Sequence, residues 1–225
     1  MTPPLAVVTG ASRGIGAACA TALAGAGFRV VRLARSVAPG AADFPCDVTD
    51  PAAVDRVARR ILDELGTPEV VVNNAGSFLL RKFEEISAAD FAAQVALNLT
   101  GAFTVARAFL PAMRQAGRGT HVTIGSIADH VGFPGNAAYS ASKYGVRGMH
   151  EAVAAEYAGS GVRCTLVSPG PTDTPIWDGV ERGPRERLPE RSQMMQADDV
   201  AAAVVFAATR PPRVRIEWIR MEPMR

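Results

Sequence analysis

Tyr139 and Lys143 are the two residues whose types and spacing suggest chemistry most directly. Four positions apart on a helix, their side chains lie on one face, a turn apart. A phenol titrates near ~10 and is a poor base at neutral pH, but a nearby ammonium favours the phenolate and lowers its pKa. Such a phenol can give or take a proton at a carbonyl or carbinol oxygen. The alternative interpretation is an amphipathic helix with a surface lysine and a half-buried tyrosine.

A glycine-rich turn near the N-terminus predicts a binding site for a dinucleotide. Residues 9–16 read T-G-A-S-R-G-I-G, follow an apolar run and open a small, alanine-rich helical pattern. Glycines permit a tight turn and a close backbone approach, and a helix N-terminus favours a pyrophosphate. The first gap is one residue wider than in G-x-G-x-x-G, and a tight turn without a ligand is the alternative. The residues expected to contact the dinucleotide here are Gly10, Ser12, Arg13, Gly14, Ile15 and Gly16.

The charges near this turn favour NADP(H) over NAD(H). A free ribose 2′-hydroxyl is usually held by an acidic residue about 20 residues beyond the glycines, but no acidic residue precedes Asp43. Instead, the second expected strand ends at Arg35, and Arg13 lies inside the turn. Two guanidiniums without a carboxylate suit a 2′-phosphate through charge-assisted hydrogen bonds. The alternative is that Arg35 is a solvated residue at a strand end.

These residues are positioned by strands and helices that alternate along the chain. Strands are expected over 5–9, 29–34, 44–48, 70–72, 121–124, 162–167 and 215–221, and helices over 14–26, 51–65, 88–115, 138–159 and 198–209. The alternation predicts an α/β fold, a single Rossmann-type domain over residues 1–225 with a doubly wound parallel sheet of about seven strands and helices on both faces. Ligands then bind at the carboxyl ends of the strands. The Pro- and charge-rich residues 173–195 are expected to form a partly helical flap at the substrate.

Composition and charge exclude several classes of function. With 225 residues, 48% of them apolar and 20% charged, the chain suits one globular domain. The formal net charge of +2 is too small to argue for nucleic acid or a membrane surface as a partner. Cys19, Cys46 and Cys164 are widely spaced and indicate buried thiols of a reducing compartment. No signal peptide is visible, and no apolar run approaches the ~20 residues of a membrane span, so we expect a cytoplasmic protein. The histidines are scattered, so we expect no metal site.

The motifs, taken in order, resemble those of the short-chain dehydrogenase/reductase family. They are Thr9–Gly16, Asn73-Asn74-Ala75-Gly76, Asn98, Ser126, Tyr139–Lys143 and Pro169-Gly170. Together they span nearly the whole chain and are highly specific. The resemblance implies an NAD(P)-dependent oxidoreductase with a catalytic tetrad. In this sequence the tetrad is Asn98, Ser126, Tyr139 and Lys143.

The family resemblance also implies a role for each member of the tetrad. Ser126, at the end of the fifth strand, would hold the substrate oxygen in line with the Tyr139 hydroxyl. Lys143 would donate to the nicotinamide ribose while keeping Tyr139 acidic. Asn98 would help to hold a water that relays protons to Lys143; without the resemblance it would be read as a solvated helix residue.

Further contacts with the cofactor are implied in the same way. Asn74, Ala75 and Gly76 are expected along its ribose, Asp47 and Val48 at the adenine edge, and Pro169, Gly170 and Thr172 or Thr174 near the carboxamide. The family often has a β-branched aliphatic residue where this chain has Thr172. Many relatives also continue into a longer C-terminal tail that helps to build a tetramer, so a homo-oligomer is expected, with dimer and tetramer both open.

The substrate pocket is expected to be lined by Ser126, Phe78, His130, Phe133 and Trp177. Asp129 and His130 are polar where many relatives carry small residues, and they could contact a polar substrate or form a local ion pair at the rim. The aromatic residues suggest an apolar wall, although aromatics on a flap can also serve only to dock it.

The function predicted from these residues is NADP(H)-dependent reduction of a ketone, aldehyde or 3-oxoacyl group to an alcohol, with Tyr139 as general acid/base. The substrate is then a small molecule. The alternatives are an NADPH-sensing binding protein with little turnover, and an epimerase or dehydratase on the same scaffold.

Overall fold

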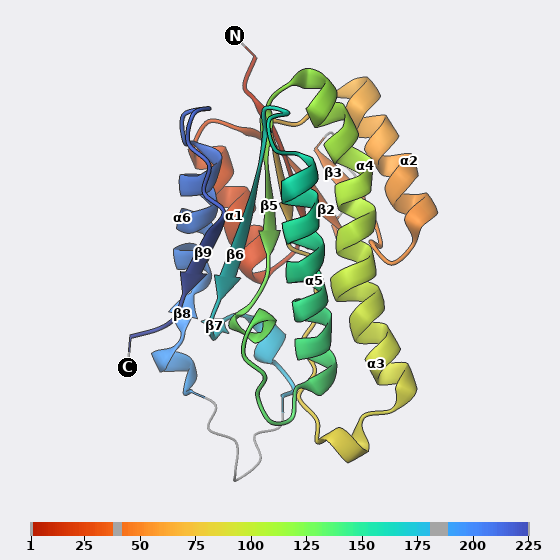
Figure 1. Cartoon of the computed structure of the whole chain (residues 1–225), viewed down its shortest axis with the longest axis vertical. Coiled ribbons are helices and arrows are strands. Elements are labelled where there is room, and N and C mark those ends of the chain that lie inside the picture. The colour runs from red at the N-terminus through yellow and green to blue at the C-terminus, as the bar shows by residue number, and fades with distance from the viewer. Residues whose placement is uncertain (1, 38–41, 181–188, 225) are drawn as a thin grey trace.

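Seven parallel strands form one sheet, which carries the candidate site at its edge (Figure 1). The structure is a computed structural model, and it describes residues 2–37, 42–180 and 189–224. The strands are β1 (Leu5–Thr9), β2 (Arg29–Ala34), β3 (Asp43–Pro45), β4 (Val70–Asn73), β5 (Gly119–Ile124), β6 (Val162–Pro169) and β9 (Trp218–Met221). Their order is β3-β2-β1-β4-β5-β6-β9. The order reverses between β1 and β4, where a doubly wound sheet binds its ligand, so the predicted fold class is confirmed.

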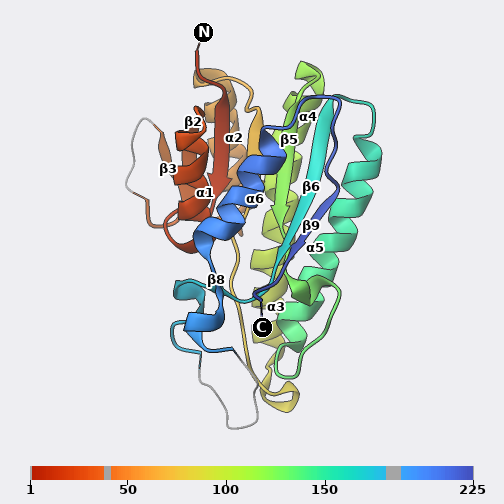
Figure 2. The ribbon, with the colours of Figure 1, turned by 90° about the vertical axis from the view of Figure 1, so that its left-hand side faces the viewer.

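Helices cover both faces of the sheet, as predicted. Helices α1 (Gly14–Gly25) and α6 (Ala197–Ala208) pack on one face and contact each other (Figure 2). The other face is covered by α2 (Pro51–Glu64), α4 (Gly101–Ala116) and α5 (Ala137–Glu156). Helices α1, α2 and α5 each follow a strand of the sheet, and their N-termini therefore lie near its carboxyl end or the loops that leave it.

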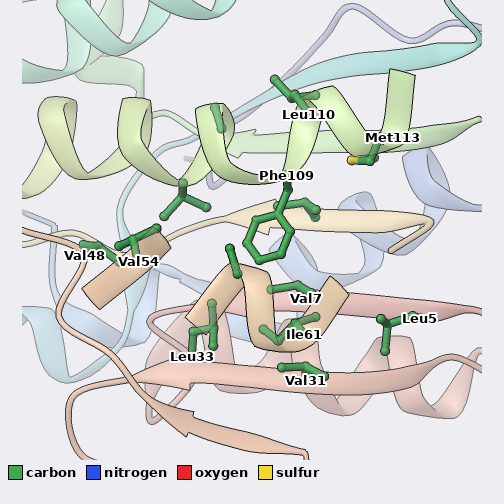
Figure 3. Close-up of a cluster of buried hydrophobic side chains, with 14 of the residues drawn as sticks. Leu5, Val7, Val31, Leu33, Val48, Val54, Ile61, Phe109, Leu110 and Met113 are labelled. Atoms are coloured by element: carbon green, nitrogen blue, oxygen red, sulfur yellow. The ribbon is translucent and has the colours of Figure 1, made fainter. Parts of the chain in front are cut away.

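The core on the α2 and α4 face anchors the central strands (Figure 3). Phe109 of α4 is fully buried and points toward Val7 of β1 and Ile61 of α2. Burial of one such side chain contributes about 1.5–3 kcal/mol. Helix α2 begins at Pro51, after Asp50, whose carboxylate accepts two backbone N–H bonds as the expected N-cap. This packing holds β1 in place, and β1 leads directly into the glycine turn.

The helical stretch between residues 88 and 116 is interrupted. Helix α3 (Ala88–Val95) is joined to α4 by a π-helical turn, η2 (Ala96–Thr100), that contains Asn98. Such turns are rare inside helices and frequently mark functional positions. By length and composition alone the stretch could cross a membrane, contrary to the expectation from the sequence. Here its second half packs as a core helix, because Phe109 and Met113 are fully buried against the sheet.

Two strands are shorter than predicted. Strand β3 ends at Pro45 because Asp47 bends the chain back, its Oδ1 accepting the backbone N–H and the hydroxyl of Thr49 at 2.9 and 2.7 Å. Strand β9 begins only at Trp218 rather than at residue 215, because side chains of β6 bond the preceding carbonyls. The hydroxyl of Thr165, for example, donates to the carbonyl of Ile216 at 2.7 Å.

The expected flap is described at its two ends only, because residues 181–188 lie outside the described part of the chain. Its described ends form a two-stranded parallel ladder, β7 (Thr172–Asp173) with β8 (Met195–Gln196), which was not predicted. They also hold two 3-10 turns, η4 (Pro175–Trp177) and η5 (Arg191–Gln193). Two further 3-10 turns are η1 (Phe83–Glu85) and η3 (Ile127–Asp129).

Candidate active site

A cavity of about 1350 Å³ opens at the carboxyl ends of the strands. Of the residues predicted to bind a dinucleotide, those that line it are Gly10, Ser12, Arg13, Gly14, Ile15, Arg35, Asp47, Val48, Asn74, Ala75, Gly76, Tyr139, Lys143, Pro169, Gly170, Thr172 and Thr174. Of those predicted to meet the substrate, the lining contains Ser126, Phe78, Phe133 and Trp177. Gly16, Asn98 and His130 do not line it.

The glycine turn is tied to the end of β4. Asn74 Nδ2 donates to the carbonyl of Thr9 at 2.9 Å, and Thr9 Oγ1 accepts the N–H groups of Asn74 and Ala75 at 2.9 and 3.0 Å. Gly10 has a φ of 65°, and a Cβ on it would lie 2.9 Å from the Cα of Ala75. A Cβ on Gly16 would overlap the Gly10 carbonyl oxygen. The prediction that Gly16 contacts the ligand is therefore corrected: Gly16 allows α1 to pack closely against the turn.

The N-terminus of α1 is open toward the cavity. Arg13 occupies the N-cap position in extended backbone, with φ −161° and ψ 172°, and its side chain forms no capping hydrogen bond with the helix. Gly14 and Ile15, the first two helical residues, line the cavity. Free N–H groups and the positive end of the helix dipole suit phosphate oxygens.

Two arginines flank the far end of this half of the cavity. Arg13 and Arg35 are exposed side chains of the lining, and neither forms an ion pair with a described acidic residue. Asp43 cannot compensate them, because Arg32 binds both of its carboxylate oxygens at 2.7 and 2.5 Å and it lies outside the lining. Asp47 is the acidic residue of this region that lines the cavity. The wall is thus mainly cationic, as the sequence predicts.

Ser126, Tyr139 and Lys143 meet where β5 ends and α5 begins. Ser126 Oγ accepts the backbone N–H of Ala128 at 3.1 Å, which fixes its rotamer, and its hydroxyl also bonds the phenol of Tyr139. Lys143 is buried, and its Nζ donates to the carbonyl of Ile124 at 2.9 Å. The same Nζ lies 5.8 Å from the centre of the Tyr139 ring. The helical spacing of Tyr139 and Lys143 therefore directs both side chains into one cavity, as predicted.

Burial dominates the titration of this pair. It raises the pKa of Tyr139 to about 12, although the hydrogen bond with Ser126 acts in the opposite direction. It also lowers the pKa of Lys143 to about 8. The expectation of a lowered phenol pKa is wrong for this structure, because the ammonium is directed to the backbone and its own charge is disfavoured. The phenol is therefore protonated at neutral pH.

Asn98 is buried behind the cavity wall rather than in it. Its Oδ1 accepts the N–H of Ser77 at 2.9 Å, and its Nδ2 donates to Ser142 Oγ at 3.0 Å and to Gln94 Oε1 at 3.2 Å. Ser142 precedes Lys143 on α5, so Asn98 braces the helix that carries the lysine. These three partners were not anticipated; the only signal was an asparagine inside a helix, where it is unfavourable without such bonds. The water-relay role implied for Asn98 stays a prediction.

Aromatic rings form the opposite wall, beside the phenol. The Phe78 ring meets the Tyr139 ring edge-on at 4.9 Å between centroids and lies 5.0 Å from Trp177. Trp177 Nε1 donates to the carbonyl of Thr172 at 2.9 Å, which locks the indole. Phe133 also lines this part, and it is 41% exposed. The position next to Tyr139 is therefore apolar.

One arginine joins the two described ends of the flap. Arg191 Nε bonds Asp173 Oδ1 at 2.6 Å, and its other nitrogens reach Asp178 Oδ1 at 3.0 Å and the carbonyl of Thr174 at 2.7 Å. A planar guanidinium can make these bonds at once. The clamp holds Thr174 and the neighbouring Trp177 at the cavity.

His130 does not contact the substrate region, and this prediction is corrected. Its Nδ1 lies 2.7 Å from Asp129 Oδ1, and its ring packs edge-on against Trp218 at 5.4 Å. The reason is the fully buried Asp129, which draws a donor toward itself because an unpaired buried carboxylate is costly. The alternative interpretation, a local pair between these two residues, is the one observed.

The arrangement as a whole can hold a phosphate-bearing ligand and move a proton beside it. Backbone N–H groups and two arginines line one half of the cavity, and a serine, a protonated phenol and a buried lysine lie in the other. A phenol within hydrogen-bond reach of a bound oxygen can donate its proton there. In the part of the chain that the structure describes, no three His, Cys, Asp or Glu side chains gather to hold a metal ion.

Comparison with known proteins places this arrangement among oxidoreductases. The family model described as short chain dehydrogenase matches residues 4–184. D-threitol dehydrogenase of Mycolicibacterium smegmatis is 35% identical over 222 residues, which cover 91% of this chain and 85% of that protein. The 3-oxoacyl-[acyl-carrier-protein] reductase of Synechocystis sp. is 35% identical over 229 residues, covering 94% of this chain and 91% of the relative.

Solved structures are similar over nearly the full length. An alcohol dehydrogenase from the archaeon Thermococcus sibiricus, complexed with 5-hydroxy-NADP, has a TM-score of 0.87 at 28% identity and covers 98% of this chain and 97% of its own. A metagenomic short-chain oxidoreductase in complex with NADP has a TM-score of 0.82 at 32% identity, covering 99% of this chain and 97% of its own. The cavity thus lies in a fold that holds NADP-type ligands in these two proteins.

Proposed function

Because the chain belongs to the short-chain dehydrogenase family, we propose that it is an NADP(H)-dependent oxidoreductase that reduces a carbonyl group to an alcohol, with Tyr139 as the proton donor. The observation that carries this proposal is one cavity shared by Ser126, Tyr139, Lys143 and the glycine turn. The glycine turn lies far from the other three residues in the sequence, and a structural role for each alone would not require them to converge.

The residues present fit a nicotinamide dinucleotide with a 2′-phosphate. The open N-terminus of α1 and the close approach allowed by Gly10 suit the pyrophosphate. Arg13 and Arg35 would hold the 2′-phosphate, and Lys143 would reach the nicotinamide ribose. Two structurally similar proteins bind NADP or a derivative of it, which supports the choice. When bound, the cofactor supplies the hydride.

The chain itself supplies orientation and a proton. The Ser126 hydroxyl, fixed by the N–H of Ala128, would hold the carbonyl oxygen beside the phenol. The Tyr139 proton would pass to that oxygen as it becomes an alcohol. Because burial keeps the phenol protonated at neutral pH, the site favours reduction there, whereas oxidation of an alcohol needs the phenolate and gains rate as the pH rises.

The apolar wall points to the class of ketone. Phe78 packs against both Tyr139 and Trp177, and Ile127, Phe133 and Ile176 also line the cavity. A substituent of the carbonyl carbon at this position gains from burial against the rings, whereas a polyol would leave hydroxyls without partners. We therefore expect ketones that carry an aryl or alkyl group to be preferred over sugars and polyols.

The test is a matched pair of tyrosine variants assayed with NADPH against acetophenone, cyclohexanone, an acetoacetyl thioester and erythrulose. Tyr139→Phe should lower kcat/KM for reduction by about 10²–10⁴-fold, the usual contribution of a general acid, with the Kd of NADPH unchanged. Tyr144→Phe, five positions along α5 and 47% exposed, is the control and should keep wild-type rates. Wild-type turnover in Tyr139→Phe would remove the proposed acid. Tight NADPH binding without turnover of any compound would favour a binding protein instead.

A further inference from the structure

Asp129 is a fully buried carboxylate at the edge of the site, and the mechanism above does not use it. Its Oδ2 accepts the backbone N–H of Ser126 at 3.2 Å and the hydroxyl of Ser168 at 2.6 Å. Its Oδ1 lies 2.7 Å from His130 Nδ1, to which we assign a proton because its partner is an acceptor. The three groups that meet this carboxyl are thus all donors, and three donors suit an ionised carboxylate.

The surrounding elements are shaped to keep this group in place. A Cβ on Gly125 would overlap Asp129 Oδ2, so only glycine leaves room at the end of β5. Ser168 of β6 is itself held by Trp218 Nε1 of β9 at 2.8 Å, and the Trp218 ring also meets the His130 ring. The carboxylate therefore joins η3 to β6 and β9, and both of its oxygens have hydrogen-bond partners, which favours a rigid arrangement.

The same carboxylate is directly connected to the proposed catalytic residues. Ser126 is the N-cap of the η3 turn and Asp129 its third residue, and they form a reciprocal capping box. This bond holds the backbone from which the Ser126 hydroxyl projects. Burial has the largest effect on the pKa of Tyr139 and of Lys143, and the negative charge of Asp129 acts on both in the raising direction.

Other charged groups lie near Asp129 on α5 and η3, and the charge of Asp129 also acts on one of them, Arg147. On α5 they are Lys143 and Arg147, and Arg147 is paired with Glu151 at 2.8 Å and stacked on Trp218 at 4.9 Å. On η3 the neighbouring group is His130, while Ser168 and Trp218, from β6 and β9, contribute only neutral donors. Among the described residues, Asp129 is the negative charge that acts on both Tyr139 and Lys143.

We propose that Asp129 is a positioning residue for the reduction: its buried carboxylate holds Ser126 in its turn and places a negative charge beside Tyr139 and Lys143 that favours their protonated forms. The proposal rests on the function proposed above. Burying a carboxylate costs free energy of folding. The positioning role gives a reason for the presence of Asp129 beside the active site. It also explains why the sequence places a His directly after it.

The experiment compares Asp129→Asn with the wild type in the pH dependence of kcat/KM, using NADPH and the ketone of the panel above that is reduced fastest. Asparagine keeps the shape and removes the charge. We expect kcat to fall about tenfold and the KM of NADPH to stay unchanged. The alkaline limb, which is the fall of kcat/KM at high pH, should move to lower pH by about one unit, because the loss of a nearby negative charge lowers the pKa that governs it. One unit is the lower end of the shift that a nearby charge produces. The limb moves the same way whether Tyr139 or Lys143 governs it.

The matched control is Asp90→Asn. Asp90 closes the same kind of capping box, with Ser87 at the start of α3, but it does not line the cavity and is not among the charges that act on Tyr139 or Lys143. Its variant should keep the wild-type limb. If Tyr139→Phe inactivates the enzyme but Asp129→Asn keeps the alkaline limb at its wild-type pH, only the positioning role of Asp129 is overturned. Activity retained by Tyr139→Phe would instead overturn the proposed function.

A second variant decides the matter if Asp129→Asn does not fold. Ser168→Ala removes one donor and leaves the charge, so kcat should fall about fivefold, as for the loss of one hydrogen bond, with the alkaline limb in its wild-type place. Unchanged kcat in Ser168→Ala would show that the network does not position Ser126 and would overturn the proposal.

Discussion

At the scale of single residues, the choice of cofactor depends on the charges of the side chains around Arg35 and Arg13. Arg35 directly follows β2, at the place where an acid would hold a ribose 2′-hydroxyl, and the first acid of the chain, Asp43, is bound by Arg32 instead. Because a phosphate oxygen is an acceptor and guanidiniums only donate, two arginines that form no ion pair within the described part of the chain favour the phosphorylated ribose. The unphosphorylated ribose would gain little from them.

Reversing the charge at Arg35 should therefore separate the two cofactors. Arg35→Asp is expected to raise the Kd of NADPH by about 10- to 100-fold, which corresponds to the ~1.5–3 kcal/mol of a hydrogen bond to a charged group, and to leave the Kd of NADH within about threefold. Arg29→Asp, an exposed arginine at the opposite end of the same strand, is the control. Fluorescence titration with each cofactor measures both constants. Equal weakening of NADPH and NADH would rule out the 2′-phosphate contact.

At the scale of elements, the turn between β1 and α1 works because two backbones touch. Gly16 packs so closely on the carbonyl of Gly10 that any side chain would push α1 away from β1 and from Asn74. The same helix contains Gly25, around which nothing lies within 4 Å of an added Cβ. Glycine is therefore required at position 16, where a side chain does not fit, whereas position 25 has room for a side chain.

Alanine at these two positions should have opposite effects. Gly16→Ala is expected to abolish measurable NADPH binding and lower the free energy of unfolding by at least about 1–3 kcal/mol, the usual result of overpacking. Gly25→Ala should raise the free energy of unfolding by about 0.4–1 kcal/mol, because alanine restricts the unfolded chain, and should keep the Kd of NADPH. Urea unfolding and NADPH titration test both variants. Wild-type cofactor binding in Gly16→Ala would contradict the close-packing account.

At the scale of the whole molecule, two buried histidines couple folding to pH. His121 of β5 and His150 of α5 stack at 6.5 Å between ring centroids inside the core. Neither ring nitrogen of His121 has a partner in the described part of the chain, whereas His150 Nδ1 lies 2.9 Å from Thr123 Oγ1. Burial lowers the pKa of His121 to about 3 and that of His150 to about 4. The folded protein therefore keeps both rings neutral.

The protein should lose stability as the pH falls below the ordinary histidine range. In the unfolded chain each ring takes up a proton near pH ~6.5, whereas in the folded protein it stays neutral. The contribution of each histidine to the free energy of unfolding is therefore complete above that pH. It declines toward pH 4 by up to about 1.4 kcal/mol per pH unit for each histidine. His121→Leu removes one of these groups. Its free energy of unfolding should therefore depend less steeply on pH between 4 and 6.5 than that of the wild type. Identical slopes in urea titrations of the two proteins would contradict this prediction.

The sequence by itself determined the order of strands and helices, the glycine turn and the convergence of Ser126, Tyr139 and Lys143. Each of these depends on local rules: the period of apolar residues, the steric freedom of glycine and the four-residue spacing on a helix. Parallel strands with helical crossovers then bring their carboxyl ends together without further information. The family resemblance of the motifs then assigned residues from 10 to 174 to one cavity in advance.

Only the tertiary structure decided which side chains face that cavity and in which charge state. His130 turns away from the cavity toward Asp129, whose position is held by Ser168, 39 residues further on. Arg191 likewise binds the carbonyl of a residue 17 positions before it. The pKa of Tyr139 rises because the fold buries the phenol, whereas the spacing alone predicted a fall. Long-range contacts and burial are properties of the packed chain, and no local pattern encodes them.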